Sequence, residues 1–358
     1  MQRVKLTAML IAAAIGASLF AGCLGNNQQN ADSEPTPPNP VTAPAAAPEP
    51  LPQGNPDGPP RTPDRVRVGV LRGPTGMGMA YLMDMHENHL TANDYTFTIG
   101  GAPEEMTAGL ISGEFDIAML PPNLASVLYN RTDGEVKALS INTFGSLFIL
   151  DATGEIASVE DLRGKTINAT GQGSVPQYTL EHILRGNGIE PGVDVDIVYN
   201  AEHTELASLM VAGDIKIGLL PQPFVTIVTM QNNDISAALS LTDEWERLRP
   251  GSGFVQGVIV ARTEFLEQST DAVELFLSDY GVSAAFANLN PEEASLLIER
   301  FDIVPAAVAR RAIPGSNLVH IYGEEMRLLT EAFLQVLFEA NPQSVGGVMP
   351  GEDFYFVG

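Results

Sequence analysis

The chain has 358 residues, of which 44% are apolar, and its 19 basic against 44 acidic residues give a formal net charge of −25. This length allows one large folded unit or two ordinary ones. A chain this acidic lacks the basic patches by which proteins hold nucleic acids or anionic lipid surfaces, so we predict no nucleic-acid partner.

The N-terminal residues 1–22 have the form of a lipoprotein signal peptide. A short basic start, Arg3 and Lys5, precedes the apolar run LTAMLIAAAIGASLFAG, which is short for a membrane-spanning helix. The run ends in LFAGC, and Cys23 is the single cysteine of the chain. This ending resembles the bacterial lipobox, although Phe20 stands where leucine is more usual. We predict that Cys23 is lipidated; the alternative is an ordinary signal peptide with an incidental cysteine.

Residues 23–64 are predicted to form a disordered, proline-rich tether. Twelve of the 26 prolines fall between Pro35 and Pro63, mixed with Ala, Asn, Glu and Gly. A segment of this composition cannot bury a core of its own. The folded part of the protein is therefore expected to begin near Arg65.

From that point the chain alternates strands and helices in two similar series. In the first series we expect strands at 66–71, 95–100 and 115–120, with helices at 79–90 and 102–113. In the second we expect strands at 165–170, 195–200 and 215–220, with helices at 177–188 and 203–213. Alternation of this kind is typical of α/β units with parallel strands.

One stretch of the first series is repeated in the second. Residues 110–121 (LISGEFDIAMLP) align without a gap with residues 210–221 (MVAGDIKIGLLP), and only Asp116 and Lys216 differ in kind. Any two α/β units look somewhat alike, but the shared register favours a duplication. We therefore predict an α/β fold of two lobes, each built on a doubly wound, mostly parallel sheet.

The segments between and after the two series set the expected boundaries. A return strand is expected at residues 254–261, and the apolar spacing near 3.6 predicts helices over most of residues 265–340. Lobe 1 is then 65–150 plus 254–358, and lobe 2 is 151–253. A two-strand hinge near 149–152 and 254–261 would absorb a closing motion.

These features together resemble one family. The lipobox, the tether, the two lobes, SVEDLRGKTI between them and the D-I-A-x-L-P strand are similar to ABC-transporter substrate-binding lipoproteins with the type II periplasmic-binding-protein-like fold. Within that fold, the chain resembles the nitrate/taurine/sulfonate and thiamine-precursor binding group over residues 65–355. The resemblance implies a receptor outside the cytoplasm, anchored to the cell membrane by lipid. It would deliver a small solute to an ABC permease and its cytoplasmic ATPase, without chemistry and without a cofactor, and we expect it to be a monomer.

Ligands bind to doubly wound sheets at the carboxyl ends of the strands. The loops RGPTGM, PPN, TGQGS and PQPF all follow predicted strands, so we expect them to meet in one cleft between the lobes. Ser174 is a plausible N-cap with Pro176 in the first turn, and helix N-termini hold anions without Lys or Arg. The resemblance implies that this turn holds a sulfonate or a similar group.

The predicted ligand-binding residues comprise turn residues and nearby polar side chains of both lobes. They are Gly73, Thr75, Gly76, Met77, Asn123, Asn142, Thr143, Thr170, Gly171, Gln172, Gly173, Ser174, Gln177, Gln222 and Phe224. Phe144 and Tyr178 are weaker candidates for the cavity wall, and a ligand contact near Glu202 and His203 is possible. We expect an anionic or heterocyclic ligand.

Other chemistries are disfavoured. Asp84, His86 and His89 share a helix but no distant third ligand accompanies them, so we predict no metal site. Neither Gly-rich turn matches a nucleotide-binding motif, and no serine or cysteine nucleophile motif accompanies the remaining histidines. The same fold is also used by cytoplasmic enzymes, namely pyrimidine-forming synthases and an enzyme of a chorismate-processing step. The predicted export signal disfavours an enzyme of this kind. A ligand-sensing subunit remains the other alternative.

Overall fold

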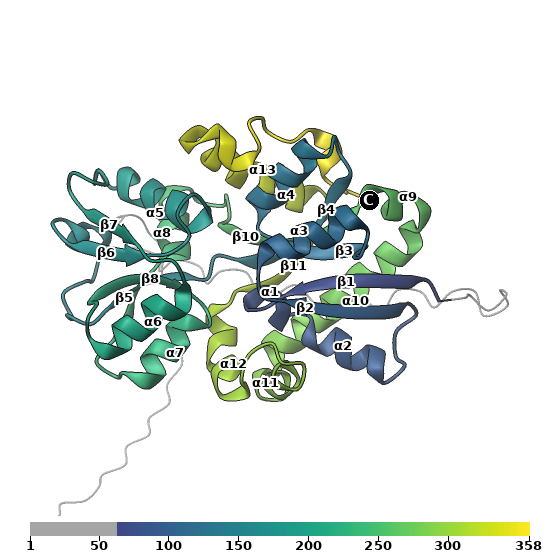
Figure 1. Ribbon diagram of the computed structural model, residues 1–358, viewed down its shortest axis with the longest axis horizontal. Helices are drawn as coiled ribbons and strands as arrows, with labels where there is room; N and C mark the ends of the chain where they lie inside the picture. The colour runs from purple at the N-terminus through teal and green to yellow at the C-terminus, as the bar shows by residue number, and fades with distance from the viewer. Residues whose placement is uncertain (1–62) are drawn as a thin grey trace, which may run out of the picture. The chain divides into compact units, whose positions relative to one another are not determined.

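The structure is a computed structural model that describes residues 63–358. These residues form two α/β lobes, of which lobe 2 is drawn in teal in Figure 1. No helix in this part of the chain combines the length and the apolar character needed to cross a bilayer. The predicted signal peptide, Cys23 and the predicted tether up to residue 62 lie outside the described residues.

Lobe 1 is built on a six-stranded sheet in the order β11-β4-β10-β3-β1-β2. Its strands are β1 (Arg65–Leu71), β2 (Asp94–Gly100), β3 (Ile117–Leu120), β4 (Val136–Phe144), β10 (Val255–Arg262) and β11 (Leu318–Tyr322). β1 lies between β2 and β3 and is parallel to both, whereas β10 is antiparallel to β3 and β4.

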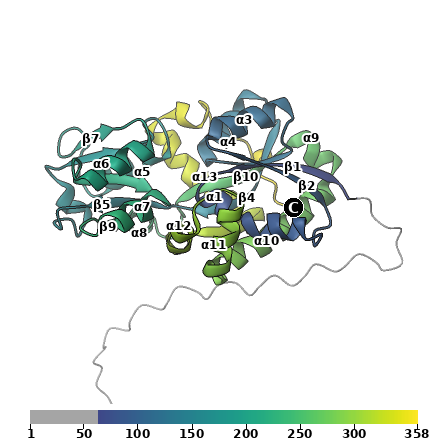
Figure 2. The same cartoon turned by 60° about the horizontal axis from the view of Figure 1, so that its bottom comes forward.

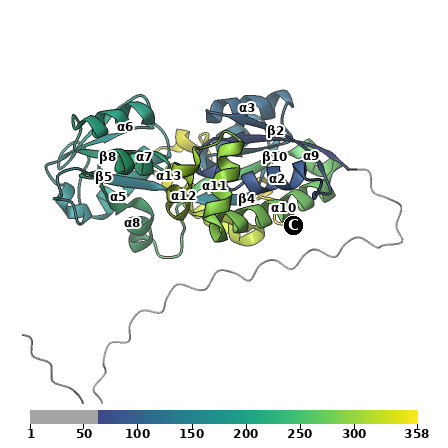
Figure 3. The same cartoon turned by 90° about the horizontal axis from the view of Figure 1, so that it is seen from below.

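Helices cover both faces of this sheet (Figure 1). They are α1 (Pro74–Met77), α2 (Ala80–Glu87), α3 (Pro103–Ser112), α4 (Pro122–Arg131), α9 (Thr263–Gln268), α10 (Thr270–Leu289), α11 (Pro291–Arg300), α12 (Ala306–Ala312) and α13 (Gly323–Ala340). Figure 3 shows α2 and α11 on the same side of the lobe, and the two helices are in contact.

Lobe 2 is built on a five-stranded sheet in the order β7-β6-β8-β5-β9. Its strands are β5 (Leu147–Asp151), β6 (Thr166–Ala169), β7 (Asp196–Tyr199), β8 (Ile217–Pro221) and β9 (Ser236–Ser240), and its helices are α5 (Val175–Gly186), α6 (His203–Ala212), α7 (Phe224–Gln231) and α8 (Leu241–Leu248). β6 is parallel to β7 and β8, and β5 is antiparallel to β8 and β9.

The two sheets share one topology, which confirms the two-lobed fold expected from the repeat. The order β2-β1-β3-β10-β4 of lobe 1 corresponds to β7-β6-β8-β5-β9 of lobe 2. The matching helices α3 and α6 both end in a left-handed glycine, Gly113 with φ 72° and Gly213 with φ 83°. Each sheet is mixed rather than mostly parallel. The fourth strand in each order, β10 in lobe 1 and β5 in lobe 2, is antiparallel to its neighbours. The chain forms this strand directly after it crosses from the other lobe.

The chain crosses between the lobes at residues 145–146 and again at 249–254, where β4 leads to β5 and α8 leads to β10. The two crossings are bonded to each other: the Gly145 N–H donates to the Phe254 carbonyl at 2.7 Å. The expected hinge positions lie a few residues further along, inside β5 and β10. The predicted lobe boundary at residue 150 falls within β5, all of which pairs with the lobe 2 sheet.

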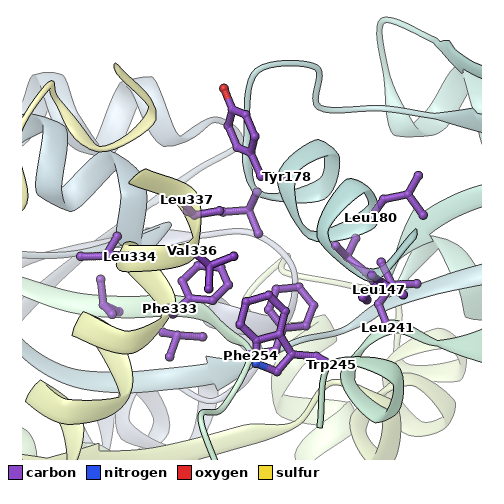
Figure 4. Packing of buried hydrophobic residues seen from close by; sticks show 14 of the residues in the cluster. Leu147, Tyr178, Leu180, Leu241, Trp245, Phe254, Phe333, Leu334, Val336 and Leu337 are labelled. Atoms are coloured by element: carbon purple, nitrogen blue, oxygen red, sulfur yellow. The ribbon is translucent and has the colours of Figure 1, made fainter. Parts of the chain in front are cut away.

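A shared hydrophobic core lies beside the crossings (Figure 4). Trp245 of α8, Phe254 and Phe333 of α13 are at most 1% exposed, and their ring centroids lie 5.3 to 5.7 Å apart. Next to them, the Asn341 amide donates to the Tyr178 hydroxyl of α5 at 2.9 Å. Figure 2 shows α13 between the sheet of lobe 1 and the helices of lobe 2. The lobes are therefore joined by side-chain packing as well as by two chain segments.

One strand was not expected. β11 lies in the stretch for which the sequence predicted helices, and it pairs with the edge of β4. Its sequence LVHIY is rich in β-branched and aromatic residues, and it is bounded by Asn317 and Gly323, both with positive φ. These two breaks separate β11 from the helices on either side.

We predict that Gly145→Ala destabilises the protein. A Cβ at this position would lie 1.9 Å from Phe254 Cδ1, and overpacking of this kind costs about 1–3 kcal/mol. Urea unfolding measures the change. Gly101→Ala is the matched control, because its Cβ would meet nothing within 4 Å; equal stabilities for the two variants would contradict the prediction.

Candidate ligand-binding site

A cavity of about 750 Å³ is lined by residues of both lobes. Its walls include the loops after β1 (72–75), β2 (101–104), β3 (121–124), β6 (171–176), β7 (202–204) and β8 (222–224). These are the carboxyl ends of all the parallel strands of the two sheets. The loops that the rule for doubly wound sheets brings together therefore line one cavity, and the loops after β2 and β7 line it as well.

Helices begin at this cavity from both sides. Loop residues at the starts of α3, α4, α5 and α6 line it, and in none of these helices does the N-cap side chain accept a hydrogen bond from the first turn. The first N–H groups of a helix have no partner within it, and the helix dipole makes this end positive. Backbone N–H donors are therefore expected at these helix starts, except at Pro103, Pro122 and Pro176, which have no N–H.

Most of the predicted ligand-binding residues line this cavity. They are Gly73, Thr75, Asn123, Thr143, Gly171, Gln172, Gly173, Ser174, Gln222 and Phe224. Gly171 and Gly173 have φ of 72° and 76°, so the turn that leads into α5 requires glycine at both positions. Ser174 occupies the expected N-cap position, but its hydroxyl donates to the Gly171 carbonyl at 2.7 Å instead of accepting from the helix.

The structure does not place the other predicted residues on the cavity wall. Met77 is fully buried in the lobe 1 core, and Gly76 is needed because a Cβ there would lie 2.5 Å from the Leu71 carbonyl oxygen. The Gln177 side chain accepts from the Gly173 N–H at 2.7 Å, so it supports the turn. Thr170 and Asn142 lie behind the wall. Phe144 and Tyr178, weaker candidates, are also absent from the wall.

Polar side chains without partners lie on the lobe 1 side of the cavity. Asn123, Asn142 and Thr143 are at most 3% exposed, and Asn123 Oδ1, both amide atoms of Asn142 and Thr143 Oγ1 have no hydrogen-bond partner. A Cβ on Gly257 would lie 2.4 Å from Asn142 Oδ1, so this glycine makes room for the amide. A buried polar group left unpaired costs about 1–3 kcal/mol. Asn123 and Thr143, which line the cavity, therefore point to a bound partner, whereas Asn142 lies behind the wall.

His203 lies on the lobe 2 side, as the first residue of α6. Its Nδ1 is 2.5 Å from Thr170 Oγ1, and its ring lies 5.2 Å from that of Phe224 at an angle of 40°. Burial lowers the pKa of His203, and Glu202 opposes this shift weakly. The imidazole is therefore neutral near pH 7.

Few charged side chains line the cavity. They are Arg72, Glu104 and Glu202. The Arg72 guanidinium donates to Asp302 at 2.9 Å and is thus already paired. Within residues 63–358, no unpaired Lys or Arg side chain reaches the cavity wall, and positive potential there comes from the backbone.

Several lining residues were not predicted. Gln256 lies on β10 near the second crossing, and its Oε1 accepts from the Ser146 N–H at 2.6 Å. Leu71, Leu147, Ile303 and Val304 add apolar surface. The one signal for Gln256 in the sequence is that it is the polar residue in the stretch from Val255 to Ala261.

Asp84 and His86 of α2 have other partners. Asp84 accepts from Arg300 at 2.7 Å, and His86 Nδ1 lies 3.1 Å from the Thr91 hydroxyl. Among the described residues, no group of three or more His, Cys, Asp or Glu side chains is placed to hold a metal ion.

We predict that Thr143→Val leaves the free energy of unfolding unchanged or raises it by about 1 kcal/mol, because it removes a buried hydroxyl that has no partner. Ser140→Ala on the same strand is the control: its hydroxyl bonds the Ile321 carbonyl and His320, so its loss should cost about 1–3 kcal/mol. A comparable loss for both variants in chemical denaturation would show that Thr143 is an ordinary structural residue.

Two α/β lobes that meet over a cavity at their strand ends are typical of the fold of periplasmic solute-binding proteins. Solved structures support this fold. An ABC transporter protein from Parabacteroides distasonis is similar with a TM-score of 0.68 and 23% identity, over 81% of this chain and 98% of that chain. The periplasmic aliphatic sulphonate binding protein SsuA from Escherichia coli has a TM-score of 0.66 and 16% identity, over 82% and 92%. The nitrate-binding protein NrtA from Synechocystis has a TM-score of 0.51 and 14% identity, over 70% of each chain.

A family model identifies the chain more closely. The model described as "ABC transporter, phosphonate, periplasmic substrate-binding protein" matches residues 79–312, well over half of the chain. The protein therefore belongs to this family. Comparison with the sequences of curated proteins gives no significant match. The resemblance to ABC substrate-binding proteins is confirmed. The chain is the extracytoplasmic solute-binding component of an ABC import system, whose partners are a small molecule, a permease and an ATPase.

Proposed function

We propose that the protein binds a small organic oxyanion in the cavity between its lobes and delivers it to the import permease. The observation that carries this proposal is the set of uncapped helix N-termini, from α3 and α4 in lobe 1 and from α5 and α6 in lobe 2, around one cavity. Such N-termini hold anions without cationic side chains. The names of the family and of its structural relatives, phosphonate, sulphonate and nitrate, support the same class.

The size and the lining of the cavity favour an organic body over a bare inorganic ion. A volume of about 750 Å³ is within the range of small-molecule sites. Apolar contacts are available from Leu71, Leu147, Ile303 and Val304, and the Phe224 ring adds a flat surface. An oxyanion head would lie at the helix ends, and an apolar or planar body would lie against these side chains.

Binding would be coupled to closure of the lobes. A ligand that touches helix ends in both lobes makes its full set of contacts only when the lobes are together, so its differential affinity shifts the population toward the closed form. The crossings at 145–146 and 249–254 are the segments about which the lobes would turn. Closure then signals occupancy to the permease.

The proposed role is binding without chemistry. Ser174, the serine that lines the cavity, donates its hydroxyl to the Gly171 carbonyl, and His203 bonds Thr170. This arrangement pairs no serine nucleophile with a histidine base. Incubation of candidate ligands with the purified protein should return them unchanged.

We expect the purified protein to bind methanesulfonate and methylphosphonate and not choline, a cation of similar size. The physical reason is the positive potential of the helix ends. The two carboxylates of the wall, Glu104 and Glu202, belong to exposed residues, where solvent screens their charge. Isothermal titration calorimetry measures affinity, and small-angle scattering measures the decrease in radius of gyration on closure. Native mass spectrometry would detect a retained ligand. Equal binding of choline, or binding of neither oxyanion, would overturn the proposal.

We also propose that Cys23 carries a lipid that holds the receptor, as a monomer, at the cell membrane. A single cysteine directly after LFAG supports this anchor. In cells, Cys23→Ser should move the protein from the membrane fraction to the soluble extracytoplasmic fraction, because the thiol that accepts the lipid is lost. Asn26→Ser, three residues further on, is the control and should stay with the membrane. Unchanged membrane association of Cys23→Ser would disprove the anchor.

A further inference from the structure

We propose that Gln222 and Gln256 form a pair of amide donors beside the crossings, which binds a hydrogen-bond acceptor on the body of the solute. The inference rests on the proposed function, because it assumes that an oxyanion head lies at the helix ends. It narrows the solute class to oxyanions that carry a second acceptor group, such as a hydroxyl or a carbonyl, and it excludes a cationic amine at that position.

The first step is the orientation of the Gln256 amide. Its Oε1 accepts from the Ser146 N–H at 2.6 Å and from the Ser146 hydroxyl at 3.3 Å. A backbone N–H can only donate, so the amide oxygen, and not the NH2 group, must face Ser146. The Nε2 group is therefore directed elsewhere, and it has no hydrogen-bond partner within residues 63–358. Gln256 is half-buried and lines the cavity.

Gln222 is held in the same way. Its Oε1 accepts from the Thr226 hydroxyl at 2.8 Å and from the Thr226 N–H at 3.3 Å, in the first turn of α7. The Gln222 side chain lines the cavity and is 7% exposed, and among the described residues its Nε2 has no hydrogen-bond partner. A buried amide donor without a partner is costly, so the two Nε2 groups require an acceptor that the protein itself does not supply.

The two glutamines lie at the end of the cavity where the chain crosses between the lobes. The Gln222 N–H donates to the Ser146 carbonyl at 2.9 Å, and the N–H of the same Ser146 donates to Gln256. Gln222 follows β8 of lobe 2, whereas Gln256 belongs to β10 of lobe 1. One residue of the first crossing therefore holds together a donor from each lobe.

The surroundings of this pair favour a neutral acceptor. Leu147, next to Ser146, is an apolar part of the wall, and the charged residues of the wall belong to the loops after β1, β2 and β7 and not to the crossings. A hydroxyl oxygen has two lone pairs and can accept from both amides, whereas an ammonium group has three donors and no acceptor. A cationic amine would thus meet two N–H groups that it cannot bond.

The experiment compares three sulfonates that have the same number of non-hydrogen atoms in the chain: isethionate, which ends in a hydroxyl, propanesulfonate, which ends in a methyl group, and taurine, which ends in an ammonium group. Calorimetry of the wild-type protein at pH 7.5 measures the three affinities. We expect isethionate to bind about tenfold more tightly than propanesulfonate, because only the hydroxyl pairs the buried amides. Taurine should bind no better than propanesulfonate.

Substitutions by glutamate test each glutamine. Gln256→Glu keeps an oxygen for the Ser146 N–H and replaces the free NH2 group by a carboxylate oxygen of the same size. It should reverse the order, so that taurine binds about tenfold more tightly than isethionate. Gln222→Glu should shift the preference in the same direction. Gln231→Glu, at the exposed end of α7 and outside the cavity wall, is the matched control and should keep the wild-type order. Thermal unfolding shows that the variants are folded, and the wild-type comparison depends on none of them.

The outcomes separate this inference from the proposed function. If wild type binds isethionate and propanesulfonate equally, the glutamines do not bind a second group, so the inference is wrong and the oxyanion receptor stands. If both glutamate variants weaken all three sulfonates by the same factor, the glutamines contact the oxyanion head itself, and the inference is again wrong. If wild type binds none of the three sulfonates and no methylphosphonate, the proposed function fails and the inference fails with it.

Discussion

The site depends on one constraint: a very acidic chain builds its positive potential from peptide groups instead of side chains. The parallel strands of both sheets end at the cavity, and each is followed by a helix that begins near the cavity wall. The cationic residue on the wall, Arg72, is already paired with Asp302. Peptide dipoles need no mobile cationic side chain, so their desolvation and ordering are completed when the lobes fold.

The junction between the lobes determines how the lobes can move relative to each other. Two chain crossings alone would leave the lobes free over a wide range of angles. The packing of Trp245, Phe254 and Phe333, together with the contact between Asn341 and Tyr178, adds a fixed core at one side of the crossings. Motion is then expected as rotation about this core, with the cavity loops moving most.

The sequence predicted much of the fold and part of the site, for identifiable reasons. Strand periodicity and the repeat at 110–121 and 210–221 located the lobes, and the strand-end rule located Gly171, Gln222 and Phe224. It did not reveal that β10 and β5, the strands that follow the two crossings, run antiparallel to their neighbours, since this depends on long-range pairing. Gly76 and Met77 lie in a short helix whose phase turns Met77 into the core.

The pairing of Thr170 with His203 illustrates a second limit. These residues lie 33 positions apart, each after a strand, and they meet because β6 and β7 are adjacent and in register. The same holds for Asn142, which lies against Gly257 of a strand more than a hundred residues later. The positions of side chains on neighbouring strands can be predicted only when the register of the sheet is known, and the local sequence pattern does not give this register.

The position of Trp245 has a practical consequence. It is the single tryptophan in the sequence, it is fully buried at the junction of the lobes, and His182 lies 5.0 Å from its ring. Indole emission responds to the polarity and the quenching groups around it, so any rearrangement at this junction alters the fluorescence of the whole protein. The molecule thus contains an intrinsic optical reporter of lobe movement, free of background from other indoles and requiring no label.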